Sequence, residues 1–248
     1  MDKVNVLGVG VSNVTLKEAL DYSMKTFFDP DQAQGKIIVT PNPEFMVKAD
    51  QDADFKAVLN QADLCLPDGI GVIKGAKYLG LNLKEKVGGY TYTLAVVEAL
   101  AKRQGSVYLL GGQVGVADKA AEIMKRDYPG IQIAGCQHGY FKADEEEAIV
   151  AAISESQADY LIVCLGVIRQ ENFMFKYREQ LNVKAMIGNG GALDTLCGVV
   201  KRAPVIWQKL GLEWLYRALD DKKRFKRLKD MIPAYFKLLK QEKKKMKN

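Results

Sequence analysis

Short apolar runs alternate with longer segments of helical periodicity through the first 200 residues of this chain. A short, nearly continuous apolar run predicts a strand buried on both faces, which is typical of parallel sheets covered by helices. Such strands alternating with helices favour an α/β fold, here a Rossmann-like, mostly parallel sheet with helices on both faces. The predicted strands are Val4–Val9, Ile37–Val39, Leu64–Leu66, Val107–Leu110, Ile131–Ala134, Tyr160–Leu165 and Ala185–Ile187.

The segments between these strands repeat apolar residues at three- and four-residue steps, the period of an amphipathic helix. Neither an internal repeat nor a low-complexity linker interrupts the first 200 residues. We therefore expect an α/β core over residues 1–200 and a basic helical appendage over residues 201–248. The predicted core helices are Leu16–Phe27, Gly71–Tyr78, Thr91–Lys102, Val116–Arg126, Glu145–Ser156 and Glu171–Gln180.

One predicted strand-to-helix corner places an asparagine between two prolines, in Thr40-Pro41-Asn42-Pro43. Pro43 suits the first helical position, where a missing N–H costs nothing, and Asn42 suits the N-cap before it. The prolines also restrict Thr40 and Asn42 to extended geometry. The corner predicts either a well-capped helix start alone or a polar site at the edge of the sheet where α/β proteins bind ligands.

Asp68 stands at a similar corner, after the predicted strand Leu64–Leu66. A carboxylate there could take a proton from a hydroxyl as a general base, and an N-cap aspartate is the structural alternative. Gly111 and Gly112 follow the strand Val107–Leu110, where the backbone N–H groups of a helix start can cradle phosphate. This glycine pair lacks the order of a dinucleotide-binding or P-loop motif, so it has little specificity.

The net charge of +6 conceals an asymmetry between the body and the tail. Residues 217–248 contain 13 Lys/Arg and 4 Asp/Glu, a balance of +9, whereas the rest of the chain is slightly acidic. A basic tail of this kind indicates a polyanionic partner, such as a membrane surface, a nucleic acid or a phosphorylated substrate. Apolar residues recur in the tail at helical steps among the lysines: Phe225, Leu228, Ile232, Tyr235, Phe236 and Leu239.

This tail pattern has two interpretations. A basic amphipathic helix with aromatic residues binds well to an anionic membrane interface. Alternatively, the helix packs its apolar face on the body and leaves its basic face in water. In either case Pro233 is expected to kink or interrupt the helix.

Several classes of protein and site are disfavoured by the sequence. The N-terminus does not have the pattern of a signal peptide, and the longest apolar stretch, Tyr160 to Ile168, is shorter than the roughly 20 residues that span a bilayer. The scattered cysteines predict buried, reduced thiols. With one histidine and no paired cysteines we expect no zinc site. The acid pairs Asp29/Asp31 and Asp52/Asp54 do not follow apolar strands, so we interpret them as solvated loop or helix acids.

Taken together, these segments resemble the WecG/TagA/CpsF family of bacterial glycosyltransferases, glycosyltransferase family 26. The resemblance extends over nearly the whole chain and is strongest in "RAPVIWQKLGLEWLYR", with "TPNPEF" and "LPDGIGV" in order before it. It implies an inverting hexosyltransferase that uses a UDP-sugar donor and a polyprenyl-diphosphate-linked sugar acceptor. It also implies a cytoplasmic protein peripheral on the inner face of the bacterial plasma membrane, without a metal or other cofactor.

The best-known branch of this family adds N-acetylmannosamine to lipid-linked N-acetylglucosamine, the committed step of wall teichoic acid linkage-unit synthesis. That activity is our main expectation. The alternatives are the same fold with another UDP-hexose, in capsule, exopolysaccharide or common-antigen synthesis, and a non-catalytic nucleotide- or nucleic-acid-binding protein. The concentration of basic residues beside an apolar stripe favours a membrane over nucleic acid. The family resemblance also allows self-association, but the sequence sets no number of subunits.

The resemblance also implies roles for individual residues. Asp68 matches the proposed catalytic base, and Thr40 and Asn42 match the polar corner beside it. Gln170 and Asp194 match a glutamine and an acid of the pocket. The tail arginines Arg217, Arg224 and Arg227 match those thought to fold over the active site, where guanidinium groups could neutralise a departing diphosphate.

Three segments depart from the common family pattern. Lys86 stands where the teichoic acid branch usually has arginine, which keeps the charge but loses the bidentate fork. Gly89-Tyr90-Thr91 replaces a Gly-x-Asp sequence, and "LGVIRQEN" lacks the usual small residue followed by Pro-Lys-Gln-Glu. Because these segments are expected near the sugar or diphosphate pocket, the donor sugar stays open.

Overall fold

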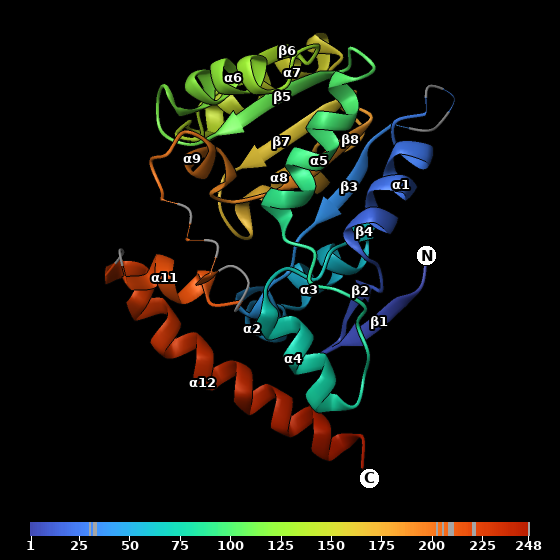
Figure 1. The fold of residues 1–248 in the computed structure, drawn as a ribbon, viewed down its shortest axis with the longest axis vertical. Helices are drawn as coiled ribbons and strands as arrows, with labels where there is room; N and C mark the ends of the chain where they lie inside the picture. The colour runs from blue at the N-terminus through green and yellow to red at the C-terminus, as the bar shows by residue number, and fades with distance from the viewer. Residues whose placement is uncertain are drawn as a thin grey trace.

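A six-stranded parallel sheet forms the centre of the protein in a computed structural model (Figure 1). The structure describes residues 1–29, 31, 34–201, 203–204, 206–207, 211–219 and 222–247, with only the backbone for residues 217 and 222–224. The strand order is β4-β3-β8-β7-β5-β6 and every pair is parallel, which confirms the predicted fold class. The strands are β3 (Lys36–Val39), β4 (Leu64–Cys65), β5 (Ser106–Gly111), β6 (Gln132–Gln137), β7 (Tyr160–Cys164) and β8 (Ala185–Gly188).

Two hydrophobic cores lie on opposite faces of this sheet. Successive side chains of β5 alternate between them: Val107 and Leu109 belong to one core, Tyr108 and Leu110 to the other. This alternation explains why the inner strands carry nearly continuous apolar runs. The helices that cover one face are α1 (Leu16–Thr26), α5 (Gly89–Ala101), α6 (Val116–Asp127) and α9 (Ala192–Leu196). Those that cover the other face are α2 (Pro43–Gln51), α3 (Ala53–Asn60), α4 (Ile70–Leu79), α7 (Glu146–Ser156) and α8 (Arg169–Lys176). The short 3-10 helix η1 (Ala143–Glu145) precedes α7.

The first predicted strand, Val4–Val9, is wrong. The chain instead forms an antiparallel hairpin outside the main sheet, with strands β1 (Lys3–Val6) and β2 (Val9–Ser12). Leu7 and Gly8 turn the chain at φ values of 56° and 84°. Positive φ at both central residues is the geometry of the tight turn that suits the twist of a two-residue hairpin. Leu7 is apolar, so the run showed no turn signal before Gly8.

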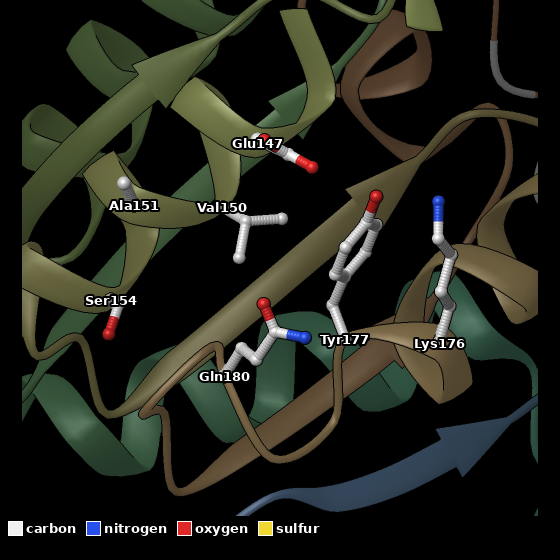
Figure 2. Close-up of a pocket in the computed structure, with 7 residues that line it drawn as sticks. All are labelled: Glu147, Val150, Ala151, Ser154, Lys176, Tyr177 and Gln180. Carbon is white, nitrogen blue, oxygen red and sulfur yellow. The ribbon is translucent and has the colours of Figure 1, made fainter. Parts of the chain in front are cut away.

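A hollow of about 520 Å³ lies between α7 and α8, on the face of the sheet that α2 and α3 also cover (Figure 2). Its walls include Val150, Tyr177 and Lys176. None of the residues that line it was predicted as a site residue. The hollow therefore lies apart from the loops at which the sequence predicts a site.

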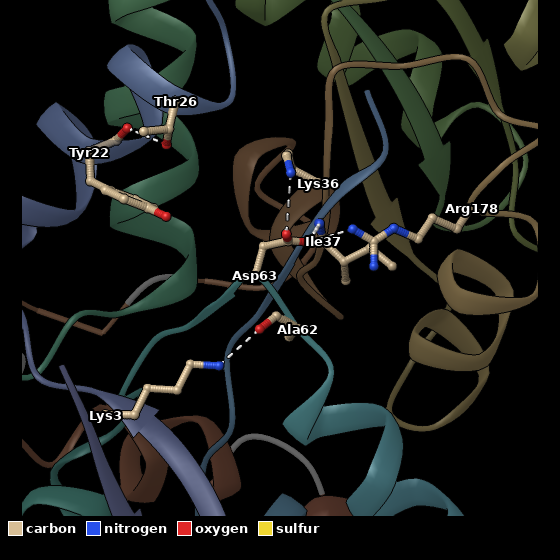
Figure 3. Close-up of polar contacts among 8 residues, drawn as sticks. All are labelled: Lys3, Tyr22, Thr26, Lys36, Ile37, Ala62, Asp63 and Arg178. Atoms are coloured by element: carbon tan, nitrogen blue, oxygen red, sulfur yellow. Dashed lines mark hydrogen bonds and ion pairs between the residues drawn. The ribbon is translucent and has the colours of Figure 1, made fainter. Parts of the chain in front are cut away.

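An ionic cluster around Asp63 ties together the amino ends of β3 and β4 (Figure 3). Asp63 Oδ2 accepts the N–H of Ile37 at 2.9 Å and a hydrogen bond from Arg178 at 2.9 Å. Lys36 Nζ lies 3.6 Å from the other carboxylate oxygen. The partners of Asp63 at this edge are backbone and cationic side chains, so its role here is structural.

The basic tail forms α11 (Glu213–Leu219) and α12 (Lys222–Lys245), and α12 packs along α2 and α4 (Figure 1). Tyr235 and Leu239 are buried against α4, and the Tyr235 hydroxyl donates to the carbonyl of Gly71 at 3.1 Å. The predicted packing of an apolar tail face on the body is thus confirmed for these residues. Of the kink or interruption predicted at Pro233, the interruption does not occur, because the helix continues through it.

Truncating Leu239 to alanine is expected to weaken the docking of α12 on α4 by about 2–5 kcal/mol. Leu239 is 2% exposed and lies against Gly75 of α4, so the smaller side chain leaves a cavity. Amide hydrogen exchange of residues 231–243 measures the effect. Phe236→Ala is the matched control, because Phe236 is 57% exposed on the same helix. Equal protection in the two variants would contradict this docking.

Candidate active site

Thr40 and Asn42 follow β3 at the carboxyl edge of the sheet. Asn42 is the N-cap of α2, as predicted: its side-chain oxygen accepts the N–H groups of Glu44 at 2.8 Å and Phe45 at 3.3 Å. The Thr40 hydroxyl donates to the carbonyl of Gly188, at the end of β8, at 3.1 Å. Capping therefore accounts for the oxygen of Asn42, while Thr40 joins two neighbouring strands at this edge.

Asp68 lies beside this corner, on the loop after β4. Its backbone N–H donates to the carbonyl of Pro41 at 3.1 Å, which ties the two corners together. The N-cap of α4 is Gly69, at φ 83°, and no side chain caps this helix. The alternative in which Asp68 serves as the N-cap is therefore wrong, and Asp68 is half-buried on this loop.

The start of α5 lies between Asp68 and Thr40 and is close to both. A side chain at Gly88 would lie 3.5 Å from Asp68 Oδ1, and one at Gly89 would lie 2.9 Å from Thr40 Cγ2. Gly89 thus has no room for a side chain, because the side chains of Thr40 and Asn189 already lie there. The structure brings Asp68 and Thr40 to one site, and the half-buried Lys86 lies two residues before Gly88 on the loop that enters it.

Gln170 and Glu171 extend this site toward the loops after β7 and β8. Gln170 Oε1 accepts the N–H of Gly190 at 2.9 Å, and its amide nitrogen donates to Glu171 Oε1 at 2.7 Å. Glu171 was not among the predicted residues. Its position next to Gln170 was a signal for it, but it stands in a polar run, whereas the structure buries it fully.

Burial raises the pKa of Glu171 to about 7, because the charged carboxylate is removed from water. A carboxyl whose pKa is higher in the folded protein stabilises the fold below its unfolded pKa, and this contribution is lost as the pH rises through 7. Between the ordinary carboxyl pKa of 4.5 and a pKa of about 7, the loss amounts to about 3 kcal/mol.

The free energy of unfolding is therefore expected to fall between pH 5 and pH 8 in the wild-type protein, and to fall less in Glu171→Gln. Urea denaturation at the two pH values measures the difference. Glu179→Gln, an exposed position beyond α8, is the control that should behave as the wild type. An unchanged pH dependence in Glu171→Gln would mean that Glu171 does not titrate in this range.

The remaining core residues of the predicted site lie farther along the edge. Asp194 is half-buried in α9, and burial raises the pKa of its carboxyl. Gly111 and Gly112 close β5, which is separated from β3 by β8 and β7. At about 5 Å per strand, the glycine pair is roughly 14 Å from the strand of Thr40 and roughly 19 Å from that of Asp68. The structure does not bring the glycine pair together with Asp68.

Both glycines of this pair are required by the close approach of neighbouring chain. Gly111 and Gly112 have φ values of 137° and 72°, and a side chain at Gly111 would collide with the backbone of Cys164. The N–H of Gly139, after β6, donates to the carbonyl of Gly112 at 2.9 Å. The loops after β5, β6 and β7 therefore meet at this point.

The tail arginines belong to helices that lie on the α2 and α4 side of the molecule. Arg217 is in α11 and Arg224 is in α12, but both side chains lie outside the described part of the structure. Arg227 of α12 is exposed. Their predicted approach to the active site stays a prediction.

Within the described ranges, no three His, Cys, Asp or Glu side chains are grouped to hold a metal ion. No helix in those ranges is both long and apolar enough to cross a bilayer. Cys65, Cys164 and Cys197 are buried free thiols as predicted, whereas Cys136 is half-buried. Burial raises the pKa of Cys65 and Cys164 to about 12, so these thiols stay protonated at neutral pH.

Comparisons with known proteins show what this chain is similar to. The chain is 38% identical over 205 residues to an N-acetylglucosaminyldiphosphoundecaprenol N-acetyl-beta-D-mannosaminyltransferase of Bacillus spizizenii, covering 83% of this chain and 79% of that protein. It is 34% identical over 242 residues to a protein of the same name from Staphylococcus aureus strain MRSA252, covering 98% of this chain and 94% of that protein. Residues 4–248 match the glycosyl transferase WecG/TagA/CpsF family, and the chain therefore belongs to this family.

Proposed function

We propose that this protein transfers N-acetylmannosamine, with inversion, from UDP-N-acetylmannosamine to N-acetylglucosamine linked to undecaprenyl diphosphate. One observation carries the proposal: the Asp68 carboxylate lies beside Gly88 and Thr40 lies beside Gly89, so both flank the start of α5, in a chain similar to relatives named for this transfer. A carboxylate at this edge of a parallel sheet is placed where α/β proteins bind ligands.

In the proposed reaction Asp68 acts as the general base. It takes the proton from an acceptor hydroxyl, which we assign as O4 of N-acetylglucosamine, as that oxygen attacks the anomeric carbon of the donor. The new bond joins this oxygen to the anomeric carbon, and the bond between that carbon and the diphosphate oxygen breaks. The electron pair leaves with UDP, and Asp68 holds the proton.

The tail arginines and the Gly111–Gly112 loop have different parts in this proposal. The β-phosphate is next to the reacting carbon, so groups that neutralise it must lie near Asp68. The glycine pair is too far along the sheet for that, at roughly 19 Å from the strand of Asp68, and suits the far end of the nucleotide. We assign neutralisation of the diphosphate to Arg217, Arg224 and Arg227, whose guanidinium groups bind phosphate bidentately.

Membrane association is proposed through the face of α12 that does not pack on the body. Phe225 and Phe236 lie on this face and are 40% and 57% exposed. Lys229 Nζ lies 5.3 Å above the ring of Phe225, so basic and aromatic groups share this face. Such a face suits an anionic bilayer surface, and we propose a peripheral position at the inner face of the plasma membrane, where a lipid-linked acceptor lies.

UDP release by the purified protein tests the proposed function. The acceptor is a short-chain prenyl-diphosphate-linked N-acetylglucosamine. Four donors are compared: UDP-N-acetylmannosamine, UDP-glucose, UDP-N-acetylglucosamine and UDP-N-acetylmannosaminuronic acid. An epimerase supplies the first of them. We expect acceptor-dependent release with UDP-N-acetylmannosamine alone. Release with another donor would contradict the proposed donor and keep the reaction. A second donor is an alternative because Lys86 and Gly89-Tyr90-Thr91, which depart from the family pattern, flank Gly88 in the chain, and Gly88 lies next to the Asp68 carboxylate.

A further inference from the structure

The polar atoms of Gln170 and Glu171 are occupied by the protein itself. Gln170 is 1% exposed and Glu171 is 0% exposed. Glu171 Oε1 accepts the amide nitrogen of Gln170 at 2.7 Å, and Glu171 Oε2 accepts the N–H of Ile168 at 2.7 Å. Gln170 Oε1 accepts the N–H of Gly190 at 2.9 Å. In this arrangement neither side chain is placed to contact a substrate directly.

The carboxyl of Glu171 determines which way the Gln170 amide points. The reverse orientation would set the amide oxygen against a carboxylate oxygen and the NH₂ group against the N–H of Gly190. Both hydrogen bonds would then be lost inside the protein, where unpaired polar groups are costly. Glu171 thereby makes Gln170 an acceptor for the loop after β8.

The loop at residues 188–191 is held from several sides at this point. A side chain at Gly188 would lie 2.8 Å from Glu171 Oε1, so the carboxyl packs directly on the backbone there. From the end of the neighbouring strand β3, the Thr40 hydroxyl donates to the carbonyl of Gly188 at 3.1 Å. The next residue, Asn189, donates to the Thr93 hydroxyl of α5 at 2.8 Å. The loop links the Glu171 pair to Thr40 and to the helix that begins beside Asp68.

We propose that Glu171 is a positioning residue that orients Gln170 and, through Gly190, fixes the loop at residues 188–191 beside Thr40 in the geometry that transfer needs. Gln170 then contributes to the site through this loop. The inference rests on the proposed function for its effect on turnover, but the orientation of Gln170 and the order of the loop are properties of the protein alone.

Exchanging the two residues is the decisive variant. In Glu171→Gln, the side chain at position 171 has one oxygen for two donors, the Gln170 amide and the Ile168 N–H. In Gln170→Glu, two carboxyl groups face each other. In the double variant Gln170→Glu/Glu171→Gln, the new glutamine donates to the new glutamate and accepts the N–H of Ile168. The new glutamate also accepts the N–H of Gly190, so all three hydrogen bonds are restored.

Amide hydrogen exchange at Gly190 measures how firmly the loop at residues 188–191 is held, and it needs no substrate. Each single variant is expected to exchange at least about tenfold faster at Gly190 than the wild type, because the pair at residues 170 and 171 loses a buried hydrogen bond and no longer holds the acceptor of the Gly190 N–H in place. The double variant and the control Glu179→Gln, an exposed glutamate beyond α8, are expected to exchange as the wild type does. Wild-type exchange in both single variants would overturn the proposal.

The rate of turnover measures how the loop geometry affects the reaction. In the single variants kcat for UDP release is expected to fall at least about tenfold, with KM for the donor changed less than about threefold, since loop geometry matters most in the transition state. The double variant should recover most of kcat. Faster exchange at Gly190 with unchanged kcat, or a double variant no better than the singles, would overturn the positioning role.

Failure of the proposed function has a different signature. If the wild type releases no UDP with any of the four donors, the proposed transfer is wrong, and the exchange rates at Gly190 alone decide whether Glu171 orders the loop. Thermal unfolding of every variant, checked at the assay temperature, separates loss of geometry from loss of folded protein.

Discussion

Replacing Asp68 by asparagine is expected to lower acceptor-dependent UDP release about 10²- to 10⁴-fold, the range that a general base contributes. Asparagine keeps the shape of the side chain and its place beside Gly88, but its amide cannot take the proton of the acceptor hydroxyl. Binding of UDP should be unchanged, because the base meets the acceptor and not the nucleotide. Rates come from UDP release and affinity from calorimetry with UDP.

The control for this variant is Asp50→Asn, which removes one carboxylate from an exposed position on α2. It should turn over as the wild type does. Asp68→Asn with near-wild-type turnover would eliminate Asp68 as the base, and loss of UDP binding together with turnover would assign it to the donor pocket instead. A fall in kcat with intact UDP binding is the result that the proposed reaction requires.

Removal of residues 213–248 is expected to lower turnover on an acceptor embedded in anionic vesicles about 10²- to 10³-fold, the effect of removing a charge-stabilising group from a transition state. The truncation takes away α11 and α12 with all three arginines assigned to the diphosphate. It also uncovers the surface of α4 on which Tyr235 and Leu239 pack, so the folded fraction must be measured by thermal unfolding alongside the rates.

Two point variants separate membrane attraction from chemistry in the tail. Arg227→Ala and Lys229→Ala each remove one positive charge from exposed positions of α12, and each should weaken vesicle binding by about 1 kcal/mol. Only Arg227→Ala should lower kcat when vesicles are saturating. Equal kcat in the two variants would exclude Arg227 from the diphosphate site, and a truncated protein as active as the full chain would exclude the tail from catalysis altogether.

Local chemistry made parts of this protein predictable from sequence. The continuous apolar runs predicted the parallel sheet, since strands buried on both faces need no polar positions. The Asn42-Pro43 pair predicted the start of α2 because an N-cap oxygen and a proline act within one helical turn. The positions of Thr40 and Asp68 after strands predicted their edge of the sheet. These features depend on contacts within a few residues, or on whether helices cover both faces of a strand.

Some errors came from signals that the local sequence lacks. The apolar Leu7 at a positive φ turned one predicted strand into a hairpin. The predicted helix Glu171–Gln180 instead runs from Arg169 to Lys176, followed by turns. Glu171 begins that predicted helix within a polar run, yet it is buried, because the loops after β7 and β8 close over it.

The sequence by itself determined the class of fold, the capped corners and the amphipathic character of the tail, because composition and short-range spacing set these. Only the tertiary structure decided how they meet. The strand order separates Gly111 from Asp68 by four strand spacings, the Tyr235 face of α12 packs on α4, and Gln170 turns inward toward Glu171. Each of these depends on contacts between residues far apart in the chain, and pairing energies of that kind leave no trace in local periodicity.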